Sequence, residues 1–444
     1  MNLRKNIRSR AVNLMLRSGN VQRQLNELKR KVGGRAHEVT VFLELDDPYS
    51  YLLSCYLPAL MQHYDIEPSI RLTRAVGGEY RPMPELLAEY AQHDCRLLAA
   101  ELGVQFLDLS DAPVVEHRRA LLAVLAAESE SDDFTALLLR VLRAYWRGDS
   151  ESVSRLVAGV SPDSGVADAL LETNQKQLLK LGHYNAATIF YGGEWYWGVD
   201  RLHYLVDRLA ALGLRRVDGE HRELASLRRA MQPNLPMTVP ASAKTLPQLH
   251  MYFSFRSPYS YLALSRIYRL ADAFGLDLRL HPVLPMVQRG LAVPRTKILY
   301  ILKDAKREAD RLGVPVGKFC DPVGEGAERC IAVYYYALAQ RRERDFCIAA
   351  GEAIFNLGID VATDDGMRSV TEKVGLFWPE VIEAMADDEW RETAQRNRVE
   401  MTEAGVWGVP SFRIGAAVLW GQDRDWLLAR QIEDMCADGD GILV

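Results

Sequence analysis

The chain contains the same local pattern twice, and this repetition constrains its fold more than any other feature. The segment PYSYL occurs at 48–52 and again at 258–262, in each case after a short apolar segment. Further along, Trp-Gly-x-Asp-Arg occurs at 197–201 and again at 420–424. Because both motifs come in the same order at a similar separation, we expect two copies of one domain.

Each half begins with a pattern typical of a β-α-β unit. A short apolar strand, 39–45 or 249–255, runs into a turn and a helix with proline in its first turn, where the missing N–H costs nothing. A second strand follows at 69–75 or 277–282. Such a connection is almost always right-handed, and it makes the two strands parallel.

The remainder of each half is expected to be helical until a closing hairpin. The helical stretches are 84–181 and 294–400, the hairpins fall within 188–197 and 411–420, and the last helices are 201–212 and 423–433. Between the halves, four prolines among Ser, Thr and Ala have the composition of a linker. The predicted domains are therefore a basic helix at 1–36, a first domain at 37–222, a linker at 223–247 and a second domain at 248–444.

Composition points to a soluble globular protein. The 444 residues are 48% hydrophobic, which is enough for sizeable cores, and no apolar run approaches the roughly 20 residues that span a bilayer. The net charge of −5 does not favour nucleic-acid binding. The six cysteines form no CxxC pair and no zinc-like cluster, so we predict no metal site and a reducing compartment, the cytoplasm.

The first 35 residues are the exception in charge, with ten Arg or Lys against the single acid Glu27. Their apolar residues recur near helical spacing and predict a basic amphipathic helix. Three interpretations remain open: a solvated helix packing on its own protein or a partner, a helix that binds a membrane surface, or an organelle transit peptide.

Ser257 and Pro258 stand at a strand-to-helix turn in the second half. A serine before proline is a good N-cap, and its hydroxyl also lies where the helix N-terminus favours an anion. The segment GVPSF at 408–412 comes directly before a predicted strand. The Val409–Pro410 bond is a candidate for the cis form, which would leave the Val409 backbone available to an extended peptide.

Together, SPYSYL at 257–262, GVPSF and WGQDR at 420–424 resemble the thioredoxin-like superfamily with a helical insertion, the DsbA-like fold. The closer resemblance is to 2-hydroxychromene-2-carboxylate isomerases and kappa-class glutathione transferases. It covers 249–435 and, more weakly, 38–212. It implies an α/β protein of two tandem thioredoxin-like domains, each with a long helical insertion, and glutathione as cofactor.

The resemblance also implies roles for individual residues. Ser257 would face the glutathione thiol, and Lys297 would bind a glutathione carboxylate. Val409 and Pro410 belong to the loop that meets the peptide, while Gln422 and Asp423 would hold its γ-glutamyl end. Asp423 could instead be only a helix cap.

Neighbouring residues have simpler alternatives. Arg424 could point to solvent, and Asp304 and Arg307 could form only a salt bridge on their helix. Tyr259, Met286 and Trp407 could line a site for an aromatic ring or belong to the core.

These roles imply a mechanism without a protein cysteine. A free thiol has a pKa of about 8.5, and a hydrogen bond from Ser257 together with the helix N-terminus would lower it. The thiolate would add reversibly to a conjugated aromatic 2-oxo acid in the isomerase version, or remain attached to the product in the transferase version.

The first half is expected to lack this chemistry. Alignment on the repeated motifs puts Asp47 opposite Ser257, Ala187 opposite Pro410 and Leu87 opposite Lys297. A carboxylate beside the thiol would oppose its ionisation by charge repulsion. We expect a structural or regulatory copy.

Two other functional classes remain as alternatives. The first is a non-catalytic glutathione-binding sensor or scaffold. The second is a protein-disulfide oxidoreductase, which requires cysteines where Ser257 and Ser260 stand and is therefore the weakest. We further expect a monomer in which the two copies form an internal pseudo-dimer.

Overall fold

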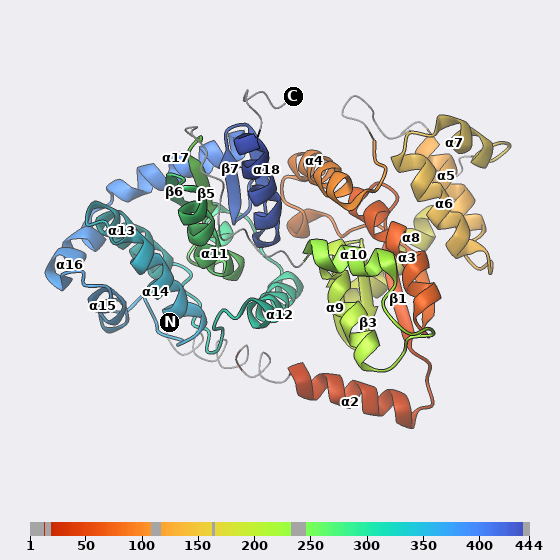
Figure 1. The fold of residues 1–444 in the computed structure, drawn as a ribbon, viewed down its shortest axis with the longest axis horizontal. Coiled ribbons are helices and arrows are strands. Elements are labelled where there is room, and N and C mark those ends of the chain that lie inside the picture. Colours follow the sequence, from red (N-terminus) through yellow and green to blue (C-terminus); the bar gives the residue numbers. More distant parts are fainter. Residues whose placement is uncertain (1–12, 14–18, 108–116, 162–164, 232–245, 438–444) are drawn as a thin grey trace. The chain divides into compact units, whose positions relative to one another are not determined.

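The computed structural model describes residue 13 and residues 19–107, 117–161, 165–231 and 246–437 (Figure 1). Beyond residue 19 the chain divides into two compact units, Asn20–Pro233 and Asn234–Val444. Both are mixed α/β, and each contains a four-stranded sheet with helices packed around it. The predicted fold class is confirmed.

The sheet of the first unit has the order β2-β1-β3-β4. Strand β1 (Glu38–Leu43) pairs in parallel with β2 (Glu67–Leu72) and antiparallel with β3 (Thr188–Tyr191). Strand β4 (Glu194–Trp197) completes the predicted hairpin. Val39, Val41 and Leu43 are buried together with Phe42, as expected of a central strand covered on both faces.

Helices connect and cover these strands. They are α2 (Gly19–Val32), α3 (Pro48–His63), α4 (Pro84–Leu102), α5 (Arg118–Ala127), α6 (Phe134–Trp146), α7 (Ser150–Leu156), α8 (Gly165–Leu181), α9 (Gly198–Ala211) and α10 (Arg222–Met231), with a 3-10 turn, η1, at Gly78–Tyr80.

The second unit repeats this topology with the order β6-β5-β7-β8. Strand β5 (Leu249–Phe253) is parallel to β6 (Leu278–Pro282) and antiparallel to β7 (Ser411–Ile414), which forms a hairpin with β8 (Ala417–Trp420). The helices are α11 (Pro258–Phe274), α12 (Arg295–Leu312), α13 (Glu325–Ala339), α14 (Glu343–Phe355), α15 (Asp364–Lys373), α16 (Trp378–Ala386), α17 (Glu389–Glu403) and α18 (Asp425–Ala437), with 3-10 turns η3 at Met286–Arg289 and η4 at Gln422–Arg424.

The repeated PYSYL segment makes equivalent contacts in the two units. Tyr49 and Tyr259 donate to Asp94 and Asp304, at 2.7 and 2.8 Å. One residue on, the serine hydroxyl accepts a hydrogen bond from the backbone at the end of the preceding strand, Glu44 N–H in one unit and Ser254 N–H in the other. The motif is therefore preserved in both halves by contacts that fix the first helix to its surroundings.

The predicted linker at 223–247 is partly wrong, because its first residues are helical. Helix α10 buries Leu224, Leu227 and Met231, which recur at i, i+3 and i+7, and packs on α9 and α3. The prolines that suggested a linker begin only at Pro233. The stretch 232–245 lies outside the described residues.

Smaller differences concern the ends of helices. Helix α9 begins at Gly198, three residues before the predicted start, and the predicted helix at 423–433 is a 3-10 turn followed by α18.

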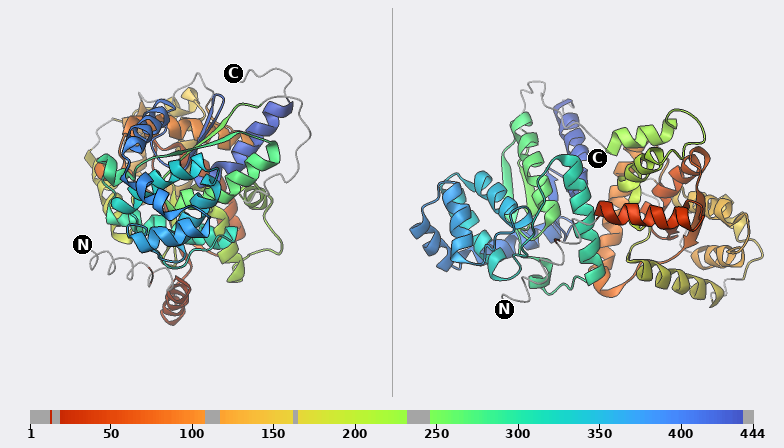
Figure 2. Two further views of the ribbon diagram at one scale, coloured as in Figure 1. Left: turned by 90° about the vertical axis from the view of Figure 1, so that its left-hand side faces the viewer. Right: turned by 90° about the horizontal axis from the view of Figure 1, so that it is seen from below.

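Helix α2 is the described part of the predicted basic N-terminal helix; most of 1–18 lies outside the described residues. The right-hand view of Figure 2 shows α2 in front of the rest of its own unit. Among the described helices, none is both long and apolar enough to cross a bilayer.

Candidate functional site

Ser257 occupies the turn between β5 and α11 and caps that helix. Its Oγ accepts a hydrogen bond from the Ser260 N–H at 3.1 Å, so the predicted N-cap is confirmed. The same hydroxyl donates to the Val409 carbonyl oxygen at 3.4 Å. The side chain is half-buried, which leaves it partly accessible at the helix N-terminus.

The loop that meets Ser257 is held rigidly at its ends. The Val409–Pro410 bond is cis, as predicted. The Pro410 carbonyl accepts from Gly421 N–H at 2.9 Å, which joins the loop to the turn after β8. A Cβ on Gly408 would lie 2.0 Å from the Trp420 ring, so only glycine fits there. The Val409 N–H has no hydrogen-bond partner among the described residues.

Lys297 lies in the first turn of α12 and faces the same loop. Its Nζ is 5.9 Å from the centre of the Trp407 ring, within the range of a cation–π contact. Burial lowers the pKa of Lys297 to about 8, so the ammonium form still predominates at neutral pH. Trp407 itself is 4% exposed and packs edge-on against Trp420, which places it in the core.

Arg289 is a second cation at this loop, and sequence reasoning missed it. Its Nη1 donates to the Trp407 carbonyl oxygen at 3.2 Å, whereas its Nε has no hydrogen-bond partner in the part of the chain that the structure describes. Burial lowers the pKa of Arg289 to about 10, and Arg398 adds to the effect. The sequence did not single out Arg289, because the chain contains 54 Lys and Arg residues in all.

Gln422 differs from the expectation for its side chain. It is 2% exposed, its amide donates to Glu308 Oε2 at 2.8 Å, and its carbonyl groups accept from Arg266. Arg266 also forms a buried ion pair with Asp425. The Gln422 side chain is therefore directed into the interior and fixes the turn.

Asp423 is the member of this turn that remains partly exposed, at 24% of its side chain. It lies inside the 3-10 turn ahead of α18, with Arg424 Nη1 at 3.5 Å from its Oδ1. Arg424 is buried, contrary to the alternative that it points to solvent. The salt bridge between Asp304 and Arg307 is confirmed at 2.6 Å.

The second unit thus brings together Ser257, Val409, Pro410, Lys297 and Asp423 around one loop, and adds Arg289. Among the described residues there is no group of His, Cys, Asp and Glu that could hold a metal ion.

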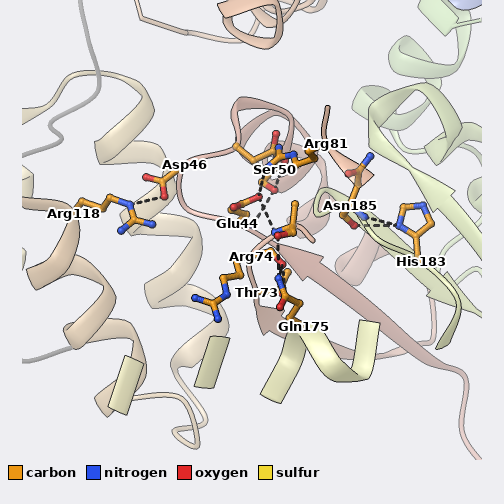
Figure 3. A network of polar contacts seen from close by, with 12 residues as sticks. Glu44, Asp46, Ser50, Thr73, Arg74, Arg81, Arg118, Gln175, His183 and Asn185 are labelled. Atoms are coloured by element: carbon orange, nitrogen blue, oxygen red, sulfur yellow. Dashed lines mark hydrogen bonds and ion pairs between the residues drawn. The ribbon is translucent and has the colours of Figure 1, made fainter. Parts of the chain in front are cut away.

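The corresponding place in the first unit contains acidic side chains, of which Glu44 and Asp46 are paired with Arg81 and Arg118 (Figure 3). Asp47 caps α3, accepting from the Ser50 N–H at 3.1 Å and the Ser50 hydroxyl at 2.7 Å. Glu44 lies beside it, and burial raises the pKa of Glu44 to about 7. Arg81 Nη1 is 3.7 Å from Glu44 Oε2. Ala187 replaces the cis proline with a positive φ of 53°.

The chemical consequence is a division between the two units. A hydroxyl at the helix N-terminus can donate a hydrogen bond to an anion, whereas an ionised carboxylate only accepts hydrogen bonds and repels it. Within the described residues, this place holds a hydroxyl in the second unit and a carboxylate in the first, and in the second unit Lys297 and Arg289 both contact Trp407.

Residues 248–433 match the family model of the DSBA-like thioredoxin domain. The second unit is therefore a DsbA-like thioredoxin domain.

Curated proteins similar to this chain are 2-hydroxychromene-2-carboxylate isomerases. That of Pseudomonas putida is 25% identical over 194 residues, 42% of this chain and 94% of the relative. That of Sphingobium xenophagum is 27% identical over 186 residues, 40% of this chain and 93% of the relative. A solved 2-hydroxychromene-2-carboxylate isomerase (HCCA isomerase) structure is 25% identical with a TM-score of 0.38, covering 42% of this chain and 95% of its own.

Proposed function

We propose that the second unit is a glutathione-dependent isomerase of conjugated aromatic 2-oxo acids, of the 2-hydroxychromene-2-carboxylate type. The observation that carries the proposal is the position of Ser257, whose hydroxyl stands at the α11 N-terminus and against the Val409 carbonyl. The similarity to isomerases of this name supports the reaction class.

Four of the residues present fit glutathione. Ser257 offers a donor where a thiolate would gain from the helix dipole. The Val409 N–H makes no hydrogen bond to any described residue, so a peptide carbonyl could accept from it. Lys297 supplies a cation for a peptide carboxylate, and Asp423 an anion for its α-ammonium group. Glutathione, when bound, supplies the thiol that adds to the conjugated substrate and leaves again after a single bond has rotated.

The protein contributes binding, orientation and charge. When glutathione binds, the Ser257 hydroxyl would turn its proton from the Val409 carbonyl to the sulfur and so favour the thiolate, without itself attacking the substrate. The Lys297 ammonium group lies over the ring of the buried Trp407. This contact would orient Lys297 toward an approaching carboxylate.

For the carboxylate of the substrate we assign Arg289. Arg289 is the last residue of η3. In the first unit, Arg81 directly follows the turn η1 and is paired with Glu44. The residue that aligns with Glu44 in the second unit is Ser254, and among the described residues no acid lies within ion-pair distance of Arg289. A guanidinium with an unpartnered Nε is suited to an incoming carboxylate.

The decisive experiment is turnover of 2-hydroxychromene-2-carboxylate, followed by its ultraviolet absorbance with and without glutathione. We expect the approach to isomer equilibrium to require glutathione and to be lost in Ser257→Ala. A product that retains glutathione would identify the transferase version instead. Glutathione binding without turnover of this or related conjugated acids would support the sensor or scaffold, and absence of binding would refute the proposal.

A further inference from the structure

Helix α2 packs on the first unit with its polar face. Arg23 Nε is 2.5 Å from Glu194 Oε1, and Asn26 Nδ2 donates to the Gly192 carbonyl at 3.0 Å. Glu194 is also bonded to Arg208 at 3.1 Å, which anchors the pair to α9. Amphipathic helices on globular proteins ordinarily turn their apolar stripe inward, so α2 has the opposite orientation.

The apolar stripe of α2 consequently faces outward. Val21, Leu25, Leu28 and Val32 follow one another at i, i+4, i+7 and i+11 and so lie on one face of the helix. Their exposures are 56, 45, 58 and 81%. Four large apolar side chains in line on 14 residues form a continuous ridge, and such a ridge indicates a binding surface.

Positive charge flanks the ridge on both sides. Successive residues of a helix are rotated by about 100° around its axis. Lys29 follows Leu28 and Lys31 precedes Val32, so the two lysines lie on opposite sides of the ridge. The Lys31 side chain is 67% exposed. The acid Glu27 is paired with Arg30 at 2.7 Å and more loosely with Lys31 at 3.8 Å.

We propose that α2 binds the surface of an anionic phospholipid bilayer. The ridge would enter the boundary between headgroups and acyl chains, and the two lysines would meet lipid phosphates. A flat anionic surface matches an apolar line with cations on both sides. The inference is independent of the proposed isomerase activity.

Flotation of the full chain with vesicles tests the proposal. The vesicles are phosphatidylcholine alone, and phosphatidylcholine with phosphatidylglycerol in a three-to-one ratio. We expect binding to the anionic vesicles only, weakened by salt because the lysines are exposed. Replacing Leu25 and Leu28 by serine should weaken binding by at least tenfold, since each buried leucine contributes on the order of tenfold.

Matched variants separate the ridge from general effects of charge and apolar exposure. Val166→Ser, at a position 70% exposed on α8, should leave binding unchanged. Lys29→Gln with Lys31→Gln should reduce binding to anionic vesicles, whereas Lys176→Gln, also on α8, should not. All these positions are on the surface, and unchanged circular dichroism verifies folding.

Three results would overturn the proposal. The first is no flotation with anionic vesicles. The second is flotation that the leucine variant does not weaken. The third is a light-scattering mass near twice 50.1 kDa that the leucine variant abolishes, which would assign the ridge to contact between two copies of the chain.

Discussion

Ser257 and Val409 lie 152 residues apart, yet the Ser257 hydroxyl reaches the Val409 carbonyl oxygen at 3.4 Å while also accepting the Ser260 N–H at 3.1 Å. The hydroxyl therefore joins the start of α11 to the loop of the cis proline. One group serves both as a helix cap and as the candidate donor to a thiolate.

Substitution of Ser257 should separate these two roles. Ser257→Ala loses the cap, at about 1 kcal/mol of stability, and loses the ionised thiol of bound glutathione. Ser257→Asp should retain the stability, because Asp47 caps α3 in the same way, but should still lose the thiolate by charge repulsion. Urea unfolding measures the first effect and ultraviolet absorbance of the thiolate the second. Thiolate retained in Ser257→Asp would contradict the role assigned to the hydroxyl.

Lys297 should make ligand binding depend on pH. Burial lowers the pKa of Lys297 to about 8, so its charge is present below that pH and is lost above it. Affinity for S-methylglutathione, which has no thiol to ionise, should therefore fall as pH rises through this range. Lys297→Arg, which stays charged, should remove that part of the fall. Calorimetry at several pH values compares the two proteins, and identical pH profiles would exclude Lys297 from carboxylate binding.

Arg289→Gln should affect the substrate and not glutathione. Loss of a hydrogen-bonded charge costs about 1.5–3 kcal/mol, so KM for the substrate should rise at least tenfold while glutathione affinity is unchanged. Arg398→Gln is the control, because Arg398 contributes positive charge nearby. Steady-state kinetics together with calorimetry checks this, and equal effects of both variants would indicate a general electrostatic contribution.

The first unit should remain inactive even when its cap is restored. Asp47→Ser supplies the hydroxyl, but Leu87 and Ala187 still replace Lys297 and Pro410. Calorimetry should give one glutathione per chain for both the native protein and this variant. A second binding event in the variant would show that Asp47 alone blocks the first unit.

Glu44 should make the stability of the first unit depend on pH. Burial raises the pKa of Glu44 from 4.5 to about 7, so the folded state binds the extra proton. Protonated Glu44 therefore makes its full contribution to the free energy of unfolding below pH 4.5. That contribution declines by up to about 3 kcal/mol as the pH rises from there through about 7. Glu44→Gln should be more stable than the native protein above pH 7 and similar near pH 4. Urea unfolding of both proteins at both pH values provides the test. If their free energies of unfolding differed equally at the two pH values, the raised pKa of Glu44 would be contradicted.

Much of the fold was predictable because it depends on local sequence. The apolar runs, the proline after the N-cap and the repeated PYSYL segment place a strand, a turn and a helix at 38–63 and again at 249–274. The cis bond was predictable from Val409–Pro410 standing directly before a strand. Helix α10 differs from the predicted linker because Leu224, Leu227 and Met231 form a buried face, whereas the prolines typical of a linker begin only at Pro233.

The sequence by itself determined the duplicated topology and the difference between Ser257 and Asp47, because these depend on residue types at a fixed place in a local motif. The tertiary structure alone decided which side chains face the site. Gln422 turns inward because Glu308 and Arg266 satisfy its amide in the core. Arg289 turns toward Trp407, and α2 presents Leu25 and Leu28 outward because Glu194 holds its polar face. Such orientations depend on partners far away in the chain, which no local pattern contains.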